Sequence, residues 1–299
     1  VDDFVGCTVE KHQDYLELHQ PDLIRKMLKE FNDEIKEMKV YETPAPSGFR
    51  VIRTEEEETK LSKDKQTRYR SGVGSLLYLV KHSRPDLSNS VRELSKVMDN
   101  ANEGQYKMLL RSIKYVNDTQ DFRLKLKANG DEKSKWKIKA YCDSDFAGDS
   151  DGRKSISGFV IYMNGMPISW RSKGQKSVSL SSTEAEYMAI SEVAMELLFV
   201  HGVMKFLGMD QELPMIVNVD NVGAIYLSQS ATTSNRTKHI DVRYHFVREF
   251  IEDGIVKIVF VRSAENDADL FTKNLGGELY RKHRGKVMTL NETKEEGIK

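Results

Sequence analysis

Four acidic residues in the second half of the chain stand where predicted strands end or where predicted helices run. Carboxylates that gather at one edge of a sheet bind hard divalent cations, which prefer oxygen ligands. Two such cations about 3.5–4 Å apart are a common device of enzymes that cleave phosphodiesters. The pattern therefore indicates a metal-dependent nuclease site, and its candidate ligands are Asp143, Glu186, Asp220 and Asp269.

A simpler explanation exists for two of these residues taken singly. The helix dipole favours carboxylates near a helix N-terminus, and Glu186 and Asp269 both lie near predicted helix starts. The explanation weakens for the group, because clustered carboxylates repel one another. At least one of them should have a raised pKa unless cations neutralise the cluster.

The composition bounds the class of protein. The chain has 299 residues, enough for two domains, and its 39% hydrophobic and 31% charged residues are typical of a globular protein. Lys plus Arg (46) balances Asp plus Glu (46), so a nucleic-acid partner would need local basic patches. Two distant cysteines, Cys7 and Cys142, favour a reducing, intracellular compartment without disulfides. We expect no transmembrane helix and no membrane partner.

Hydrophobic periodicity predicts the elements that position the acids. Residues 1–46 are predicted as two strands and a helix, and residues 66–116 as helices. The charged stretch at 130–133 predicts a boundary between a domain over 1–130 and a second over 137–275, followed by a charged tail over 276–299. The second domain should be an α/β fold with a mixed five-stranded sheet flanked by helices. Its predicted strands cover residues 137–141, 157–163, 166–170, 213–219 and 255–261.

Candidate nucleic-acid contacts are short polar residues near the acids and two basic clusters. Helix capping is the alternative role of the short polar residues, with Ser182 and Thr183 as candidate N-caps. A merely solvated surface is the alternative for the basic clusters. The polar candidates are Ser144, Ser182, Thr183 and Asn221, and the basic ones are Arg171, Lys173 and Lys176 in one cluster and Arg236, Lys238, His239 and Arg243 in the other.

Several motifs in the second half resemble the ribonuclease H domain of copia-type LTR retrotransposon Pol polyproteins. They lie at 141–149, 153–155, 168–173, 180–187, 237–245 and 268–273 and occur in the same order. The first half, at 4–7, 43–44, 69–79 and 83–87, resembles the end of the reverse transcriptase with a thumb or connection-like segment. The resemblance implies a polyprotein fragment without the polymerase aspartate pair, which normally lies upstream.

The resemblance also implies a fold and a reaction. The expected fold is ribonuclease H-like, and the expected reaction is hydrolysis of the RNA strand of an RNA–DNA hybrid to 5′-phosphate and 3′-hydroxyl ends. Two Mg²⁺ ions, for which Mn²⁺ can substitute, would be held by the four acids. The upstream reverse transcriptase would be a partner, in the cytoplasm, in virus-like particles or in the nucleus. One departure is that the loop 262–266 lacks the His that many ribonucleases H carry, which predicts slow turnover.

Two other classes of function stay open. A degenerate ribonuclease H fold could bind the hybrid or a protein partner without cutting it. A nuclease of the integrase or transposase type also carries acids on a similar sheet, although the motifs above favour ribonuclease H. The sequence does not predict an oligomeric state.

Overall fold

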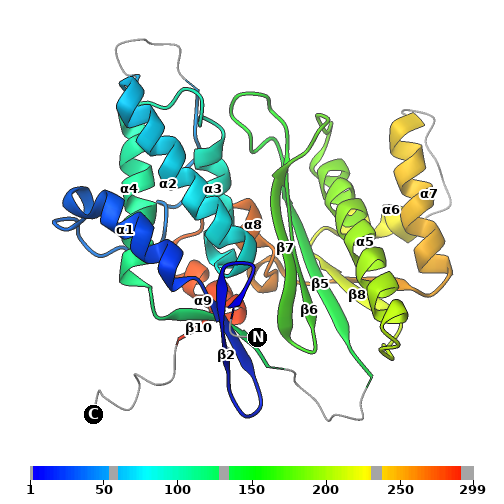
Figure 1. The fold of residues 1–299 in the computed structure, drawn as a ribbon. Helices are drawn as coiled ribbons and strands as arrows, with labels where there is room; N and C mark the ends of the chain where they lie inside the picture. Colours follow the sequence, from blue (N-terminus) through cyan, green and yellow to red (C-terminus); the bar gives the residue numbers. More distant parts are fainter. Residues whose placement is uncertain (1–2, 54–59, 128–134, 230–237, 291–299) are drawn as a thin grey trace. The chain divides into compact units, whose positions relative to one another are not determined.

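The computed structural model describes residues 3–53, 60–127, 135–229 and 238–290, and the description excludes the side chains of residues 238–244. The chain divides into two compact units (Figure 1). Unit 1 comprises Val1–Lys127 together with Lys273–Lys299, and unit 2 comprises Ala128–Thr272. Unit 1 is therefore built from both ends of the chain, and unit 2 from the segment between them.

Unit 2 contains the mixed five-stranded sheet that the sequence predicted. Its strands are β5 (Ile138–Asp145), β6 (Ile156–Met163), β7 (Met166–Gly174), β8 (Met215–Val219) and β9 (Val256–Phe260), in the spatial order β7-β6-β5-β8-β9. The first three form an antiparallel meander, while β8 pairs parallel with both β5 and β9. The central strand β5 is buried at almost every position, as a strand covered on both faces must be.

Helices cover both faces of this sheet. Three of them, α5 (Ser182–Phe206), α6 (Val222–Gln229) and α7 (Lys238–Glu252), lie on one face, and the short α8 (Asp269–Thr272) lies on the other (Figure 1). A 3-10 turn, η3 (Ser263–Glu265), precedes α8.

The long helix α5 is apolar on more than one side. Tyr187, Ile190, Val193 and Leu197 are buried against the sheet. By length and composition alone α5 could also cross a membrane, which the sequence analysis did not anticipate, but half of its most apolar stretch is buried inside unit 2. A helix that is hydrophobic all round is also typical of a protein core, and here α5 packs on β5 and β6.

Unit 1 combines helices with a small antiparallel sheet. Its helices are α1 (Pro21–Ile35), α2 (Lys63–His82), η2 (Pro85–Leu87), α3 (Ser88–Ser95), α4 (Glu103–Asp118) and α9 (Gly277–Val287). Its strands are β1 (Asp3–Phe4), β2 (Cys7–Lys11), β3 (Leu16–His19), β4 (Phe122–Leu126) and β10 (Thr289–Leu290), in the order β1-β2-β3-β4-β10. The helical core includes Phe31, Leu76 and Leu109.

Residues 277–290, which the sequence predicted as part of a charged tail, form a helix and a short strand instead. Helix α9 buries Tyr280, His283 and Val287 within unit 1, and β10 then pairs with β4. The Tyr280 hydroxyl donates a hydrogen bond to the Asp86 carbonyl at 3.0 Å, beside the buried ion pair between Arg84 and Asp86. Part of the attachment of this segment comes from the buried Tyr280 hydroxyl, which a hydrophobic pattern cannot reveal.

Gly158 on β6 allows α8 to approach the sheet closely, which generates a stability prediction. A Cβ at this position would lie 2.6 Å from Thr272 Cγ2 and 3.0 Å from the Phe271 backbone carbon. We expect Gly158→Ala to destabilise unit 2 by about 1–3 kcal/mol through overpacking. Urea unfolding followed by tryptophan fluorescence measures this, because Trp136 and Trp170 both lie in unit 2.

The matched control is Gly174→Ala at the end of β7, where a Cβ would meet nothing within 4 Å. Both substitutions restrict the unfolded chain alike. Equal stability of the two variants would contradict the close approach of α8.

Candidate active site

Two of the candidate acids stand at the same edge of the unit 2 sheet. The parallel register pairs Tyr141 of β5 with Asn218 of β8, and Asp143 and Asp220 each follow two residues later. Neighbouring parallel strands present their carboxyl ends at one edge, where ligands gather. Asp143 is only 2% exposed, whereas Asp220 is partly exposed.

The third acid, Glu186, lies in the first turns of α5. Ser181 is the N-cap of this helix and accepts a hydrogen bond from the Glu184 backbone N–H, and the Glu184 carboxylate accepts one from the Leu180 N–H at 2.8 Å. Glu184 therefore stabilises the helix start. Glu186 lies two residues further on, faces the sheet and is 5% exposed.

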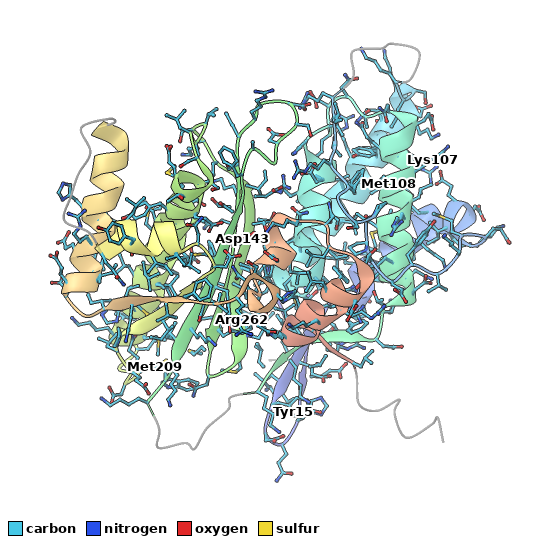
Figure 2. All side chains as sticks on the ribbon, turned by 180° about the vertical axis from the view of Figure 1, so that it is seen from behind. Tyr15, Lys107, Met108, Asp143, Met209 and Arg262 are labelled. Atoms are coloured by element: carbon cyan, nitrogen blue, oxygen red, sulfur yellow. The ribbon has the colours of Figure 1, made fainter. Side chains whose placement is uncertain are left out.

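The three carboxylates form one cluster. Each of Asp143, Glu186 and Asp220 offers an oxygen that lies within 4.8 Å of those of the other two; Figure 2 labels Asp143 on the sheet of unit 2. Glu186 Oε1 accepts hydrogen bonds from the Ser144 N–H and hydroxyl, both at 3.0 Å. Glu186 Oε2 is buried and has no hydrogen-bond partner among the described residues.

This donor set fits a divalent cation. An unsatisfied buried carboxylate oxygen is costly, and a cation ligated by Oε2 would remove that cost. All the available ligands are carboxylate oxygens, the type that Mg²⁺, Ca²⁺ and Mn²⁺ prefer. The cluster is therefore a candidate site for such an ion.

Burial and repulsion determine the protonation of the metal-free cluster. Burial, followed by the charges of Asp143 and Asp220, raises the pKa of Glu186 from 4.5 to about 9. The two hydrogen bonds from Ser144 oppose this shift but do not cancel it. Without a cation, Glu186 therefore holds a proton at neutral pH, as expected for crowded carboxylates. Burial, followed by interactions with Glu186, Asp143 and Asp220, also raises the pKa of the Cys142 thiol, which makes it a poor nucleophile.

The fourth candidate, Asp269, stands apart from the cluster of three. It begins α8 and is 6% exposed, but it does not belong to the set whose oxygens all lie within 4.8 Å. Thr272, one turn later, links α8 to the cluster, because its hydroxyl donates a hydrogen bond to Asp143 Oδ2. The neighbouring acid Asp267 is buried as well and accepts a hydrogen bond from the Tyr162 hydroxyl at 3.3 Å.

Two of the four predicted polar nucleic-acid contacts, Ser144 and Asn221, have local structural roles. Ser144 orients Glu186, as described above. Asn221 Oδ1 accepts a hydrogen bond from the Ala224 N–H at 3.0 Å and so caps α6. Ser182 and Thr183 are not the N-caps that the sequence suggested, because Ser181 takes that position and they follow it in the first turn.

In the first predicted basic cluster, one residue forms an ion pair within unit 2 and the other two are exposed. Arg171 on β7 contacts Glu196 of α5 at 3.2 Å, while Lys173 and Lys176 are exposed. In the second cluster, Arg236 lies outside the described residues. Lys238, His239 and Arg243 belong to α7, but their side chains also lie outside the description.

Sequence reasoning missed two residues that hold the site together. Thr272 contacts Asp143, and Asn266 donates from its amide to the Cys142 carbonyl at 3.0 Å. Asn266 Oδ1 also accepts a hydrogen bond from the Ala268 N–H at 3.2 Å, which ties the start of α8 to β5. Asn266 directly precedes Asp267, and Thr272 follows Asp269 by three residues. This nearness to acidic residues is the only sequence signal that could have pointed to them.

A mixed sheet in the order β7-β6-β5-β8-β9, with carboxylates at the ends of two central strands, defines a ribonuclease H-like domain. No protein-family model matches the chain. The retrovirus-related Pol polyprotein from transposon TNT 1-94 of Nicotiana tabacum is 35% identical over 261 residues, which cover 86% of this chain and 19% of that polyprotein. Over most of its length the chain is similar to these retrovirus-related transposon Pol polyproteins, as the sequence motifs predicted.

Two further comparisons extend this result. The Pol polyprotein from transposon RE2 of Arabidopsis thaliana is 38% identical over 221 residues, 74% of this chain and 15% of that polyprotein. The chain thus spans less than a fifth of the length of these relatives. The solved structure of LC11-RNase H1, isolated from compost, covers 49% of this chain and 96% of its own at 17% identity and a TM-score of 0.35. The ribonuclease H-like fold of unit 2 is assigned from its strand order, and the likeness to this solved structure carries no part of that assignment.

The raised pKa of Glu186 predicts how metal-free stability depends on pH. Between pH 4.5 and about 9, the folded state keeps a proton on Glu186 that the unfolded chain has already released. Stability should therefore fall as pH rises through this window, by up to about 1 kcal/mol per pH unit. In EDTA, we expect Glu186→Gln to remove most of this slope and to be more stable than the wild type at about pH 8.

Urea unfolding at several pH values, read by tryptophan fluorescence, measures the slope. Glu184→Gln serves as the control, because Glu184 is a carboxylate of the same helix that accepts a hydrogen bond from the Leu180 N–H at the start of that helix. A pH slope in Glu186→Gln as steep as that of the wild type would contradict the assignment.

Proposed function

We propose that unit 2 is a metal-dependent endoribonuclease that cleaves the RNA strand of RNA–DNA hybrids during reverse transcription of a retrotransposon. The observation that carries this proposal is the cluster of Asp143, Glu186 and Asp220, in which Glu186 Oε2 has no hydrogen-bond partner among the described residues. The ribonuclease H-like fold and the similarity to transposon Pol polyproteins support it.

Asp143, Glu186 and Asp220 would hold the divalent cations, with Asp269 at the start of α8 as a further ligand. Bound Mg²⁺, or Mn²⁺ in its place, supplies activation of a water and stabilisation of the leaving oxygen in such sites. The water oxygen bonds to the phosphorus and gives up a proton to solvent as the bond from phosphorus to the 3′-oxygen breaks. The 3′-oxygen takes up a proton from solvent, so the products carry 5′-phosphate and 3′-hydroxyl ends. Two ions are proposed, since four acids exceed what one ion with substrate oxygens needs.

Other side chains position these ligands. The two hydrogen bonds from Ser144 hold Glu186 Oε1, which leaves Oε2 for a cation. The Thr272 hydroxyl holds one oxygen of Asp143 in the same way. Hydrogen bonds from outer groups orient ligands and tune their affinity, so α8 acts on the cluster through Thr272.

The proposed substrate partner is an RNA–DNA hybrid, and the proposed protein partner is the reverse-transcriptase portion of the polyprotein. Lys173 and Lys176 are exposed and available for phosphates, which carry most protein–nucleic acid contacts. Arg171 is a weaker candidate because it pairs with Glu196. Ser182, Thr183 and Asn221 remain candidates for contacts with the hybrid backbone, alongside Arg236, Lys238, His239 and Arg243.

A cleavage assay tests the proposal. The full chain is incubated with a labelled RNA–DNA hybrid in Mg²⁺ or in EDTA. We expect RNA cleavage only with the metal, and at least about a 100-fold loss in Asp143→Asn and Asp220→Asn, because ligands of one site act as a unit.

The controls are Asp145→Asn and Asp267→Asn, neighbours of the proposed ligands that should lose much less activity. Asp145 ends β5, and Asp267 accepts a hydrogen bond from Tyr162. An equal loss in Asp145→Asn and Asp143→Asn would overturn the choice of ligand. Hybrid binding without cleavage would identify a non-catalytic binding module, and cleavage of duplex DNA would identify an integrase-type nuclease.

A further inference from the structure

A second group of metal-binding residues lies in unit 1, on the hairpin formed by β2 and β3. The antiparallel register places Glu10 directly opposite Glu17 and Thr8 opposite His19. The His12 N–H donates to the Tyr15 carbonyl at 3.0 Å and closes the turn. Because side chains alternate between the faces of a strand, Glu10, His12, Glu17 and His19 share one face.

This arrangement is unfavourable without a cation. Like charges directly opposite each other on neighbouring strands destabilise a hairpin, and Glu10 and Glu17 are such a pair. The Glu17 side chain is only 1% exposed. Both of its oxygens are buried without a hydrogen-bond partner among the described residues, and so is His12 Nε2. A buried carboxylate in this state carries a large desolvation cost.

The ligand atoms are close enough to share one ion. One ligand atom from each of Glu10, His12 and Glu17 lies within 4.8 Å of the other two. His12 Nε2 and Glu17 Oε2 are 3.6 Å apart, near the roughly 3.3 Å edge of a tetrahedron with bonds of about 2.0–2.1 Å. Glu10, which is partly exposed, is the third member of this ligand set.

Neighbouring groups hold these ligands in place. His19 Nε2 lies 2.6 Å from Glu10 Oε1, so the histidine orients Glu10 and leaves its second oxygen available. The Tyr15 ring, labelled in Figure 2, stacks on His12 at 4.1 Å with an interplanar angle of 14°. Lys125 stands opposite Glu17 on β4, but its Nζ lies 4.0 Å above the Tyr15 ring. Glu17 therefore keeps both oxygens free of a hydrogen bond from this lysine.

We propose that Glu10, His12 and Glu17 bind a divalent transition-metal ion of the zinc type, with His19 as the partner that positions Glu10. One imidazole with two carboxylates suits Zn²⁺, Co²⁺ or Ni²⁺, whereas Mg²⁺ prefers oxygen ligands alone. The ion cross-links β2 to β3 and neutralises Glu17. This site is independent of the carboxylate cluster in unit 2, since it uses other residues and other ligand chemistry.

The test is a Zn²⁺ titration of the full chain carrying Asp143→Asn and Asp220→Asn, so that the unit 2 cluster does not contribute. Isothermal calorimetry gives the dissociation constant, and the visible spectrum of Co²⁺ reports tetrahedral geometry. We expect one saturable site. Glu17→Gln and His12→Gln should each weaken it at least about 100-fold, and His19→Gln about 10–100-fold, as for a positioning residue.

Two controls keep the result specific. Asp14→Asn removes an exposed carboxylate from the same turn, and His201→Gln removes a histidine of α5; neither should change the Zn²⁺ affinity. His12 is partly exposed, so His12→Gln should fold even if the buried Glu17→Gln does not, which circular dichroism checks. Unchanged affinity in His12→Gln, or a parent chain without saturable Zn²⁺ binding, would overturn the proposal.

Discussion

Repulsion among three partly or fully buried carboxylates is the constraint on which the arrangement of unit 2 depends. Two parallel strands and one helix bring together Asp143, Glu186 and Asp220, and the packing of these elements does not depend on the carboxylates. The apolar core beneath them supplies the free energy that keeps like charges close. The result is a region of negative potential whose cost falls when a cation or a proton enters, so the cluster is poised to bind positive charge.

The same constraint explains the polar residues around the cluster. Ser144 donates two hydrogen bonds to one oxygen of Glu186, and Thr272 donates one to Asp143. These bonds limit the directions in which the carboxylates can turn to relieve repulsion. The close contact of α8 with Gly158 matters for this reason, because it fixes the position from which Thr272 reaches the cluster.

The fold of unit 2 and three of its acids could be predicted because their signals are local. Short hydrophobic patterns indicate the strand that carries Asp143, the strand that ends before Asp220 and the helix start before Glu186, although β5 continues two residues past Asp143. Thr272 and Asn266 could not be predicted, since their roles depend on contacts with β5, more than a hundred residues away. Helix α9 was mistaken for a tail because its buried Tyr280 is held by hydrogen bonds to Asp86 and Tyr115, which a hydrophobic pattern does not show. In the hairpin, the spacing of two residues between Glu10 and His12, and between Glu17 and His19, places each pair on one face of its strand. Only the cross-strand register shows that the two pairs meet.

The discontinuity of unit 1 has a consequence for how the chain is made. Ribosomal synthesis delivers all of unit 2 before α9 and β10 exist, so unit 2 can fold while unit 1 still lacks its last strand. Tyr280 then has to reach Asp86, which was synthesised almost two hundred residues earlier. A protease that cut the chain just after α8 would leave unit 2 whole and still joined to Val1–Lys127, and would sever α9 and β10 from the rest of unit 1. Polyprotein processing at that junction would therefore act on the two units unequally.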